Sequence, residues 1–100
     1  MRIYISGPMS NMPDLNRPAF NAKAVELRAL GHEVVNPAEL PEIPGGEWAD
    51  YMKVDLPLLL TCEAIYLLDG WAHSKGAKIE KQLAYDLDFS IYGPSWAMRL

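Results

Sequence analysis

Strand-like runs alternate with helical segments along the whole chain, which predicts an α/β protein, a three-layer sandwich of the Rossmann or flavodoxin-like kind. Alternation of this type favours parallel strands joined by right-handed crossovers. We therefore expect a four-stranded parallel sheet in the order 2-1-3-4, with helices on both faces. The chain has 100 residues, too few for two cores, so residues 1–100 are expected to form one domain.

Four segments have the composition of β-strands. Residues 2–6 (RIYIS) place Ile3 and Ile5 on one face and Tyr4 on the other. Residues 64–68 (AIYLL) are almost entirely apolar, as expected of a central parallel strand that is buried on both faces. The predicted strands are residues 2–6, 33–35, 64–68 and 89–92.

Three segments between these strands have helical periodicity. The first begins near Pro18 and ends at Gly31, the second begins near Glu47, and the third spans residues 77–88. Pro57 either kinks the second helix or ends it, because proline removes a backbone donor and clashes with the preceding turn. The expected buried side chains are Phe20, Ala24, Val25, Leu27 and Leu30 in the first helix, and Ile79, Leu83 and Leu87 in the third.

Ligands of such sheets bind beyond the carboxyl ends of the strands, where the strand order reverses. This rule points to the loops at residues 7–17, 36–46 and 69–76. Residues 37–46 contain three prolines and two glycines and form either a lid or a plain surface connection. Residues 74–76 (SKG) lead directly into a helix, whose N-terminus suits a phosphate or a sugar hydroxyl, although ordinary helix capping also explains them.

Carboxylates are the candidate catalytic groups. Glu80 lies one turn into the third helix, beside the small residues Gly76 and Ala84, although glutamate also favours first turns for the helix dipole alone. Asp55, at the Pro57 break, or Asp69, at the end of the third strand, could pair with it. Two carboxylates about 5–5.5 Å apart, one a nucleophile and one an acid, are the equipment for retaining cleavage of a glycosidic bond.

Two aromatic side chains could serve either the site or the core, and the histidines fit no recognised site. Tyr4 can hydrogen-bond a carboxylate or pack in the core, and Trp71 can stack on a base or cover the end of the sheet. His32 and His73 lie at no metal-ligand spacing, and no Ser-His-Asp or Cys-His arrangement is suggested. We therefore expect neither a metal nor a cofactor.

Composition excludes several partners. Nine basic and thirteen acidic residues give a net charge of −4, whereas a nucleic-acid polymer requires a basic face. No apolar run approaches the roughly 20 residues that cross a bilayer, so no membrane partner is expected. The single cysteine, Cys62, forms no internal disulfide, and a reducing cytoplasm is the expected location.

The C-terminal segment carries large apolar residues where most chains fray. Trp96, Met98 and Leu100 either fold back on their own domain or pack on a neighbour. Because the core is small, we expect a homodimer or higher homo-oligomer formed through this tail.

Six short motifs follow one another along the chain: YISGP at residues 4–8, VNP at 35–37, DL at 55–56, CEAIYLL at 62–68, DGW at 69–71 and SKGAKIEKQLA at 74–84. In this order they resemble the nucleoside 2-deoxyribosyltransferase superfamily, which includes the deoxynucleoside 5′-monophosphate N-glycosidases, and within it a subgroup of small phage and bacterial proteins. The resemblance covers roughly residues 2–92.

The resemblance implies roles for the matching residues. Glu80 matches the nucleophile that attacks C1′ of the deoxyribose, Asp55 an acid that protonates the departing base, and Tyr4 a tyrosine that orients the nucleophile. Asp69 lies near a further acid of the transferases. The expected substrate-binding residues are Gly7, Pro8, Met9, Arg17, Asn36, Gly70, Trp71, Ser74, Gly76 and Ser95; Ser74 would contact a phosphate and Ser95 a neighbour's site.

This chemistry requires an ionised Glu80 and a protonated Asp55, and neighbouring features of the sequence favour both states. We expect the helix dipole, with Lys78 and Lys81, to keep Glu80 ionised, and burial or a neighbouring carboxylate to keep a proton on Asp55. Pro57, two residues after Asp55, is a departure from the family pattern that could displace the acid.

The predicted function is cleavage or transfer at the N-glycosidic bond of a 2′-deoxynucleoside or its 5′-monophosphate, with a small-molecule nucleoside or nucleotide as partner. A related enzymatic possibility is cleavage of the glycosidic bond of NAD. The alternatives are a non-catalytic nucleotide-binding module of the same fold and a small protein that binds a partner through its apolar tail.

Overall fold

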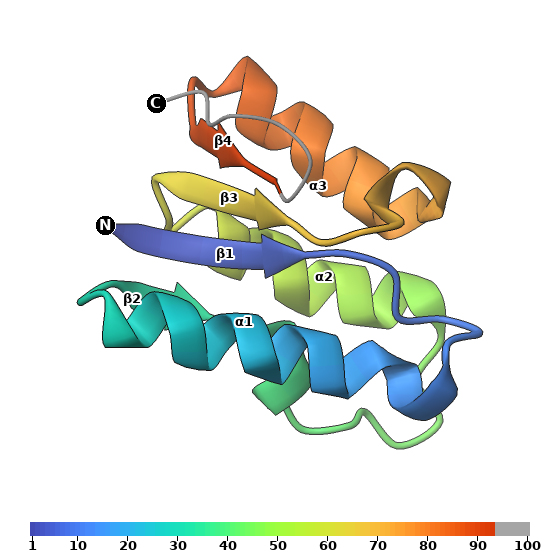
Figure 1. Cartoon of the computed structure of the whole chain (residues 1–100). Coiled ribbons are helices and arrows are strands. Elements are labelled where there is room, and N and C mark those ends of the chain that lie inside the picture. The colour runs from blue at the N-terminus through green and yellow to red at the C-terminus, as the bar shows by residue number, and fades with distance from the viewer. Residues whose placement is uncertain (94–100) are drawn as a thin grey trace.

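The computed structural model describes residues 1–93 and confirms the predicted α/β architecture (Figure 1). Within these residues, four parallel strands form one sheet in the order β2-β1-β3-β4. Ser95 and the rest of the apolar tail lie outside the described residues. The strands are β1 (Arg2–Ser6), β2 (Glu33–Val35), β3 (Ala64–Leu67) and β4 (Ser90–Tyr92), and the α-helices are α1 (Arg17–Ala29), α2 (Trp48–Leu59) and α3 (Lys75–Asp86).

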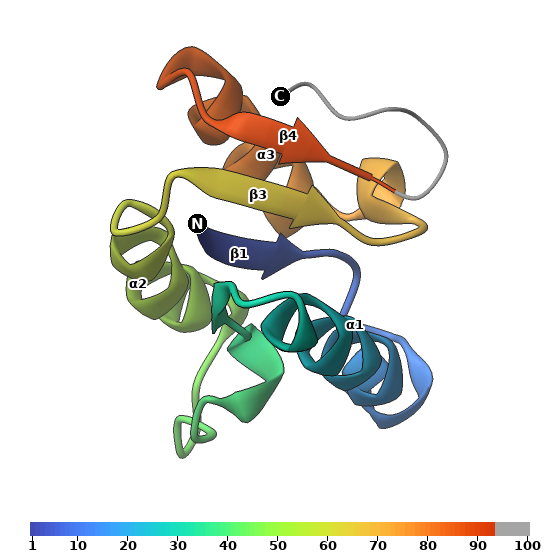
Figure 2. The ribbon, with the colours of Figure 1, turned by 60° about the vertical axis from the view of Figure 1, so that its left-hand side comes forward.

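Helices cover both faces of the sheet, with α1 on one side and α2 and α3 on the other (Figures 1 and 2). The alternation of β1 divides the core accordingly. Ile3 and Ile5 pack with Phe20 and Leu27 of α1. Tyr4, on the opposite side of the strand, packs in the layer that α2 and α3 cover.

The buried stripe of α1 is narrower than the sequence predicts. Phe20, Ala24 and Leu27 are buried, as expected, but Val25 and Leu30 are 69 % and 70 % exposed. Only one line of residues at steps of four and three faces the sheet. Val25 is turned about 100° away from Ala24 on the helix, and Leu30 follows the last helical residue.

The buried face of α3 also differs from the prediction. Ile79 is 40 % and Leu87 50 % exposed, whereas Glu80 lies inside. The face turned towards the rest of the molecule consists of Gly76, Ala77, Glu80 and Ala84. The three small residues let the helix backbone approach its neighbours closely: a Cβ on Gly76 would lie 3.2 Å from the Met52 sulfur of α2. Close packing therefore selects small side chains here, which hydrophobic periodicity does not detect.

Helix α2 continues through Pro57, so the proline does not end it. Asp55 consequently stays on a regular helical turn. Helix α3 starts two residues earlier than predicted, because the Ser74 hydroxyl accepts the Ala77 N–H at 3.2 Å and caps the first turn. Among residues 1–93, no helix is both long and apolar enough to cross a bilayer.

Candidate active site

Glu80 is held by two hydroxyl groups from a neighbouring strand. The Tyr4 hydroxyl donates to Oε2 of Glu80 and the Ser6 hydroxyl to Oε1, each at 2.6 Å. Tyr4 and Ser6 are two residues apart on β1, so both side chains point to the same face of the sheet. Because both carboxylate oxygens are bonded and the residue is only 5 % exposed, the orientation of Glu80 is fixed.

Burial controls the protonation of Glu80. Desolvation raises its pKa to about 7, the hydrogen bonds from Ser6 and Tyr4 oppose this shift, and the charge of Asp55 adds to it. The helix dipole and the two lysines, which were expected to keep Glu80 ionised, therefore do not offset the effect of burial on its pKa. Lys78 is exposed, and the Lys81 ammonium lies over aromatic rings instead, 5.0 Å from the centre of Tyr85.

Two further titratable groups, the Asp55 carboxyl and the Tyr4 phenol, belong to the site. Asp55 lies on α2, and partial burial raises the pKa of its carboxyl to about 6. Burial, followed by the neighbouring Glu80 charge, raises the pKa of Tyr4 well above its ordinary value, so the phenol remains a donor. The structure thus brings together Tyr4, Asp55 and Glu80, as the resemblance implies.

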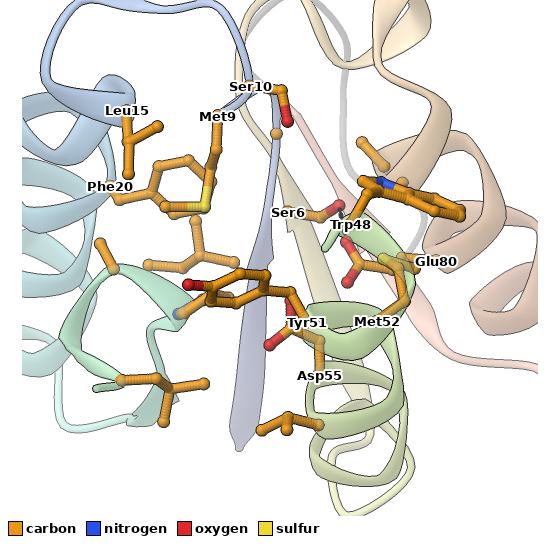
Figure 3. Close-up of a pocket in the computed structure, with 18 of the residues that line it drawn as sticks. Ser6, Met9, Ser10, Leu15, Phe20, Trp48, Tyr51, Met52, Asp55 and Glu80 are labelled. Atoms are coloured by element: carbon orange, nitrogen blue, oxygen red, sulfur yellow. Dashed lines mark hydrogen bonds between the residues drawn. The ribbon is translucent and has the colours of Figure 1, made fainter. Parts of the chain in front are cut away.

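These three residues line one cavity at the carboxyl end of β1, with a volume of about 740 Å³ (Figure 3). This size is in the range of small-molecule sites. The polar residues of its lining include Ser6, Ser10, Asp55, Ser74 and Glu80. The apolar residues of its lining include Met9, Leu15, Phe20, Leu40, Ile43, Trp48 and Met52, of which Trp48 and Met52 lie on the same side as Glu80 (Figure 3).

The proline-rich segment at residues 37–46 forms a wall of the cavity. The Tyr51 hydroxyl of α2 accepts the Ile43 N–H at 3.0 Å. Arg17, at the start of α1, forms an ion pair with Glu42 at 3.2 Å. The segment is therefore not a plain surface connection, because it lines the cavity, and its action as a lid stays a prediction.

The predicted binding residues divide into two groups. Gly7, Met9, Arg17, Ser74 and Gly76 line the cavity, whereas Pro8, Asn36, Gly70 and Trp71 do not. Asn36 is buried and has a structural role: its side chain accepts the Ala38 N–H and donates to Asn21.

Asp69 is not brought to Glu80. It lines a separate hollow together with Lys23 and Tyr66. The chain leaves β3 through Leu68, which packs on the α1 side, and then turns at Gly70, whose φ is +87°. The carboxylate that follows the strand therefore lies apart from the layer that contains Glu80.

Ser6 is a site residue that was not predicted from the sequence. The available signal was its spacing of two from Tyr4 on a predicted strand, which places both hydroxyls on one face. Within residues 1–93, no group of three His, Cys, Asp or Glu side chains is placed to hold a metal ion.

The fold and the cavity define an α/β protein with a buried carboxylate at the carboxyl end of a parallel sheet. A solved structure of 2-deoxyribosyltransferase from the psychrotolerant bacterium Bacillus psychrosaccharolyticus has a similar fold. The TM-score is 0.73 at 24 % identity, over 93 % of this chain and 71 % of that one. The chain belongs to the family described as a domain of unknown function, DUF4406, whose model matches residues 1–92. No curated protein matches it.

Proposed function

We propose that this protein cleaves or transfers at the N-glycosidic bond of a 2′-deoxynucleoside or its 5′-monophosphate, with Glu80 as nucleophile. The observation that carries the proposal is the pair of 2.6 Å hydrogen bonds that fix both oxygens of a buried carboxylate. Asp55 lines the same cavity and supplies a second carboxyl. The fold likeness to a 2-deoxyribosyltransferase, and the motifs it shares with that superfamily, support the same chemistry.

In the first step, ionised Glu80 attacks C1′ of the deoxyribose. The bond from C1′ to the base nitrogen breaks, its electron pair moves to the base, and Asp55 donates a proton to the departing base. A glycosyl ester of Glu80 results. Water then attacks C1′ in a hydrolase, or a second base attacks it in a transferase, and the Asp55 carboxylate takes the proton that the attacking group loses. The bond from C1′ to Glu80 breaks, and the carboxylate leaves with its bonds to Tyr4 and Ser6 restored.

This mechanism requires ionised Glu80 together with protonated Asp55. With pKa values of about 7 and about 6, that combination is a minor form, and its population is greatest between pH 6 and 7. We therefore expect a bell-shaped dependence of rate on pH with its maximum in this interval.

We also propose that the protein acts in the cytoplasm as a homo-oligomer of the small phage and bacterial type. The lone Cys62 and the apolar residues Trp96, Met98 and Leu100 motivate this proposal. Removal of residues 94–100 should lower the molar mass measured by light scattering after size exclusion. An unchanged mass would contradict assembly through the tail.

A base-release assay tests the activity. The protein is incubated with the four deoxynucleosides and their 5′-monophosphates, with and without an acceptor base, and free base is followed by chromatography. We expect release by the wild type and by the matched control Asp69→Asn, which lies in the other hollow, and a loss of at least about a thousandfold in Glu80→Gln. Full turnover by Glu80→Gln would eliminate Glu80 as nucleophile. No release from any substrate would favour a nucleotide-binding module.

A further inference from the structure

Arg17 is the only cationic side chain among the described residues that line the cavity. Three carboxyl groups line the same cavity, those of Glu42, Asp55 and Glu80. A substrate with a 5′-phosphate would bring a dianion into this surrounding. The charge balance of the described wall therefore opposes a phosphate and tolerates an uncharged nucleoside.

Both ends of the Arg17 guanidinium are already engaged. Nη1 lies 2.9 Å from Oδ1 of Asp14, and Nη2 lies 3.2 Å from Oε1 of Glu42. A phosphate would have to displace or share these partners. Lys75, between the lining residues Ser74 and Gly76, has its ammonium 4.2 Å from the centre of the Trp48 ring.

Two of the backbone N–H groups at the start of α3 are already engaged. The Ala77 N–H bonds to the hydroxyl of Ser74 and the Lys78 N–H to its carbonyl. The Ser74 hydroxyl therefore already accepts a hydrogen bond and keeps one O–H to donate to an oxygen of the ligand.

We propose that the site takes a nucleoside without a 5′-phosphate, and that Glu42 is a specificity-determining residue that acts by holding Arg17. This inference rests on the proposed function. Because the Glu42 side chain is 77 % exposed, its pair with Arg17 is a weak one. Removal of the Glu42 charge should therefore change the substrate preference by about threefold to fivefold rather than abolish it.

The test compares kcat/KM for a deoxynucleoside and its own 5′-monophosphate at one low ionic strength, so that screening is constant. The wild type should prefer the nucleoside at least tenfold. Glu42→Gln should lower this ratio about threefold to fivefold, and Arg17→Gln in the same chain should cancel the change. The matched control is Glu39→Gln, which removes an exposed carboxylate that pairs with Arg28 at 2.7 Å and lies outside the cavity lining. Its ratio should equal that of the wild type.

Binding is measured in parallel with Glu80→Gln protein by calorimetry, so that the inference does not depend on turnover. Lack of turnover with both substrates overturns the proposed function, and the binding preference then decides the inference. Tighter binding of the nucleoside supports it; tighter binding of the monophosphate, or binding of neither, overturns it. A wild-type preference for the monophosphate, or an unchanged ratio in Glu42→Gln, also overturns it.

Discussion

On the α1 face of the sheet, β1 contributes Ile3 and Ile5 to an apolar layer, whereas on the opposite face the same strand contributes Tyr4 and Ser6 to a bonded carboxylate. The first face removes apolar surface from water and stabilises the fold. The second buries Glu80 at 5 % exposure, where its ionisation is unfavourable. One strand thus separates stability from chemistry by its alternation alone, and the two faces should respond differently to substitution.

The largest effect should come from Asp55 on the polar face. We expect Asp55→Asn to lower kcat about 10²- to 10⁴-fold, because the amide cannot protonate the departing base. The alkaline limb of the pH–rate profile should disappear as well. Asp50→Asn on the same helix, outside the cavity lining, is the control. Loss of rate with the alkaline limb retained would contradict the role of Asp55 as acid.

On the apolar face the effect should be on stability alone. Ile3 is 2 % exposed, so Ile3→Ala should lower the free energy of unfolding by about 2–5 kcal/mol through lost burial and a cavity. Urea unfolding measures the loss, and base release per folded molecule should match the wild type. A specific-activity loss in fully folded Ile3→Ala would show that the two faces are not separable.

Substitution of a buried, hydrogen-bonded residue usually destabilises a protein, but Glu80→Gln should stabilise this one at alkaline pH. Burial raises the pKa of Glu80 to about 7, above the ordinary 4.5, so the folded state holds this proton more tightly than the unfolded state. The stability contributed by protonated Glu80 is complete below about pH 4.5 and is lost as pH rises through 7. Gln undergoes no such loss.

The variant should therefore exceed the wild type by about 3 kcal/mol at pH 8 and match it near pH 4.5. Chemical denaturation at both pH values gives the two differences. If the difference were the same at both values, burial of the Glu80 charge would not be what limits stability on this face.

The smallest effect should come from the hydroxyl donors. The Tyr4 hydrogen bond lowers the pKa of Glu80, so Tyr4→Phe should raise that pKa further. Because the pKa of Glu80 lies above that of Asp55, the alkaline limb of the rate profile follows Glu80 and should move upward. We expect up to about tenfold lower kcat/KM at pH 6, since the loss of one pKa unit of hydrogen bonding is about 1.4 kcal/mol. Ile3→Val, on the other face of β1 and outside the cavity lining, should leave the limb in place. An unmoved limb in Tyr4→Phe would show that the phenol does not tune Glu80.

Much of the architecture was predictable, because the alternation of strand-like and helical segments, and the prolines and glycines that end them, are local features of the sequence. The strand order, β1 and the carboxylate pair of Asp55 and Glu80 follow from apolar runs, from prolines and glycines, and from motif resemblance. The strand Arg2–Ser6 lies where it was expected, and helix α1 ends at Ala29, two residues before the expected Gly31.

The remainder depends on distances between elements, which no local pattern encodes. The buried face of α3 is made of small residues and Glu80, so a search for large apolar side chains selects Ile79 and Leu87 instead. Asp69 lines a separate hollow, away from Glu80, because the chain turns at Gly70. The pKa of Glu80 could not be predicted either, because it depends on how completely the folded chain excludes water.

The proline-rich wall of the cavity has a consequence for how a ligand enters. Pro37, Pro41 and Pro44 restrict the backbone before any ligand arrives, and the Tyr51 hydroxyl holds Ile43 between them. Ordering a flexible residue costs about 1–2 kcal/mol of conformational entropy, so a wall that is already ordered leaves more of the contact energy as affinity. We therefore expect the cavity to bind its ligand as a preformed site, without closure of this wall. Substitution of side chains on this wall would then be enough to change which ligand the cavity prefers, and no new hinge motion would be needed.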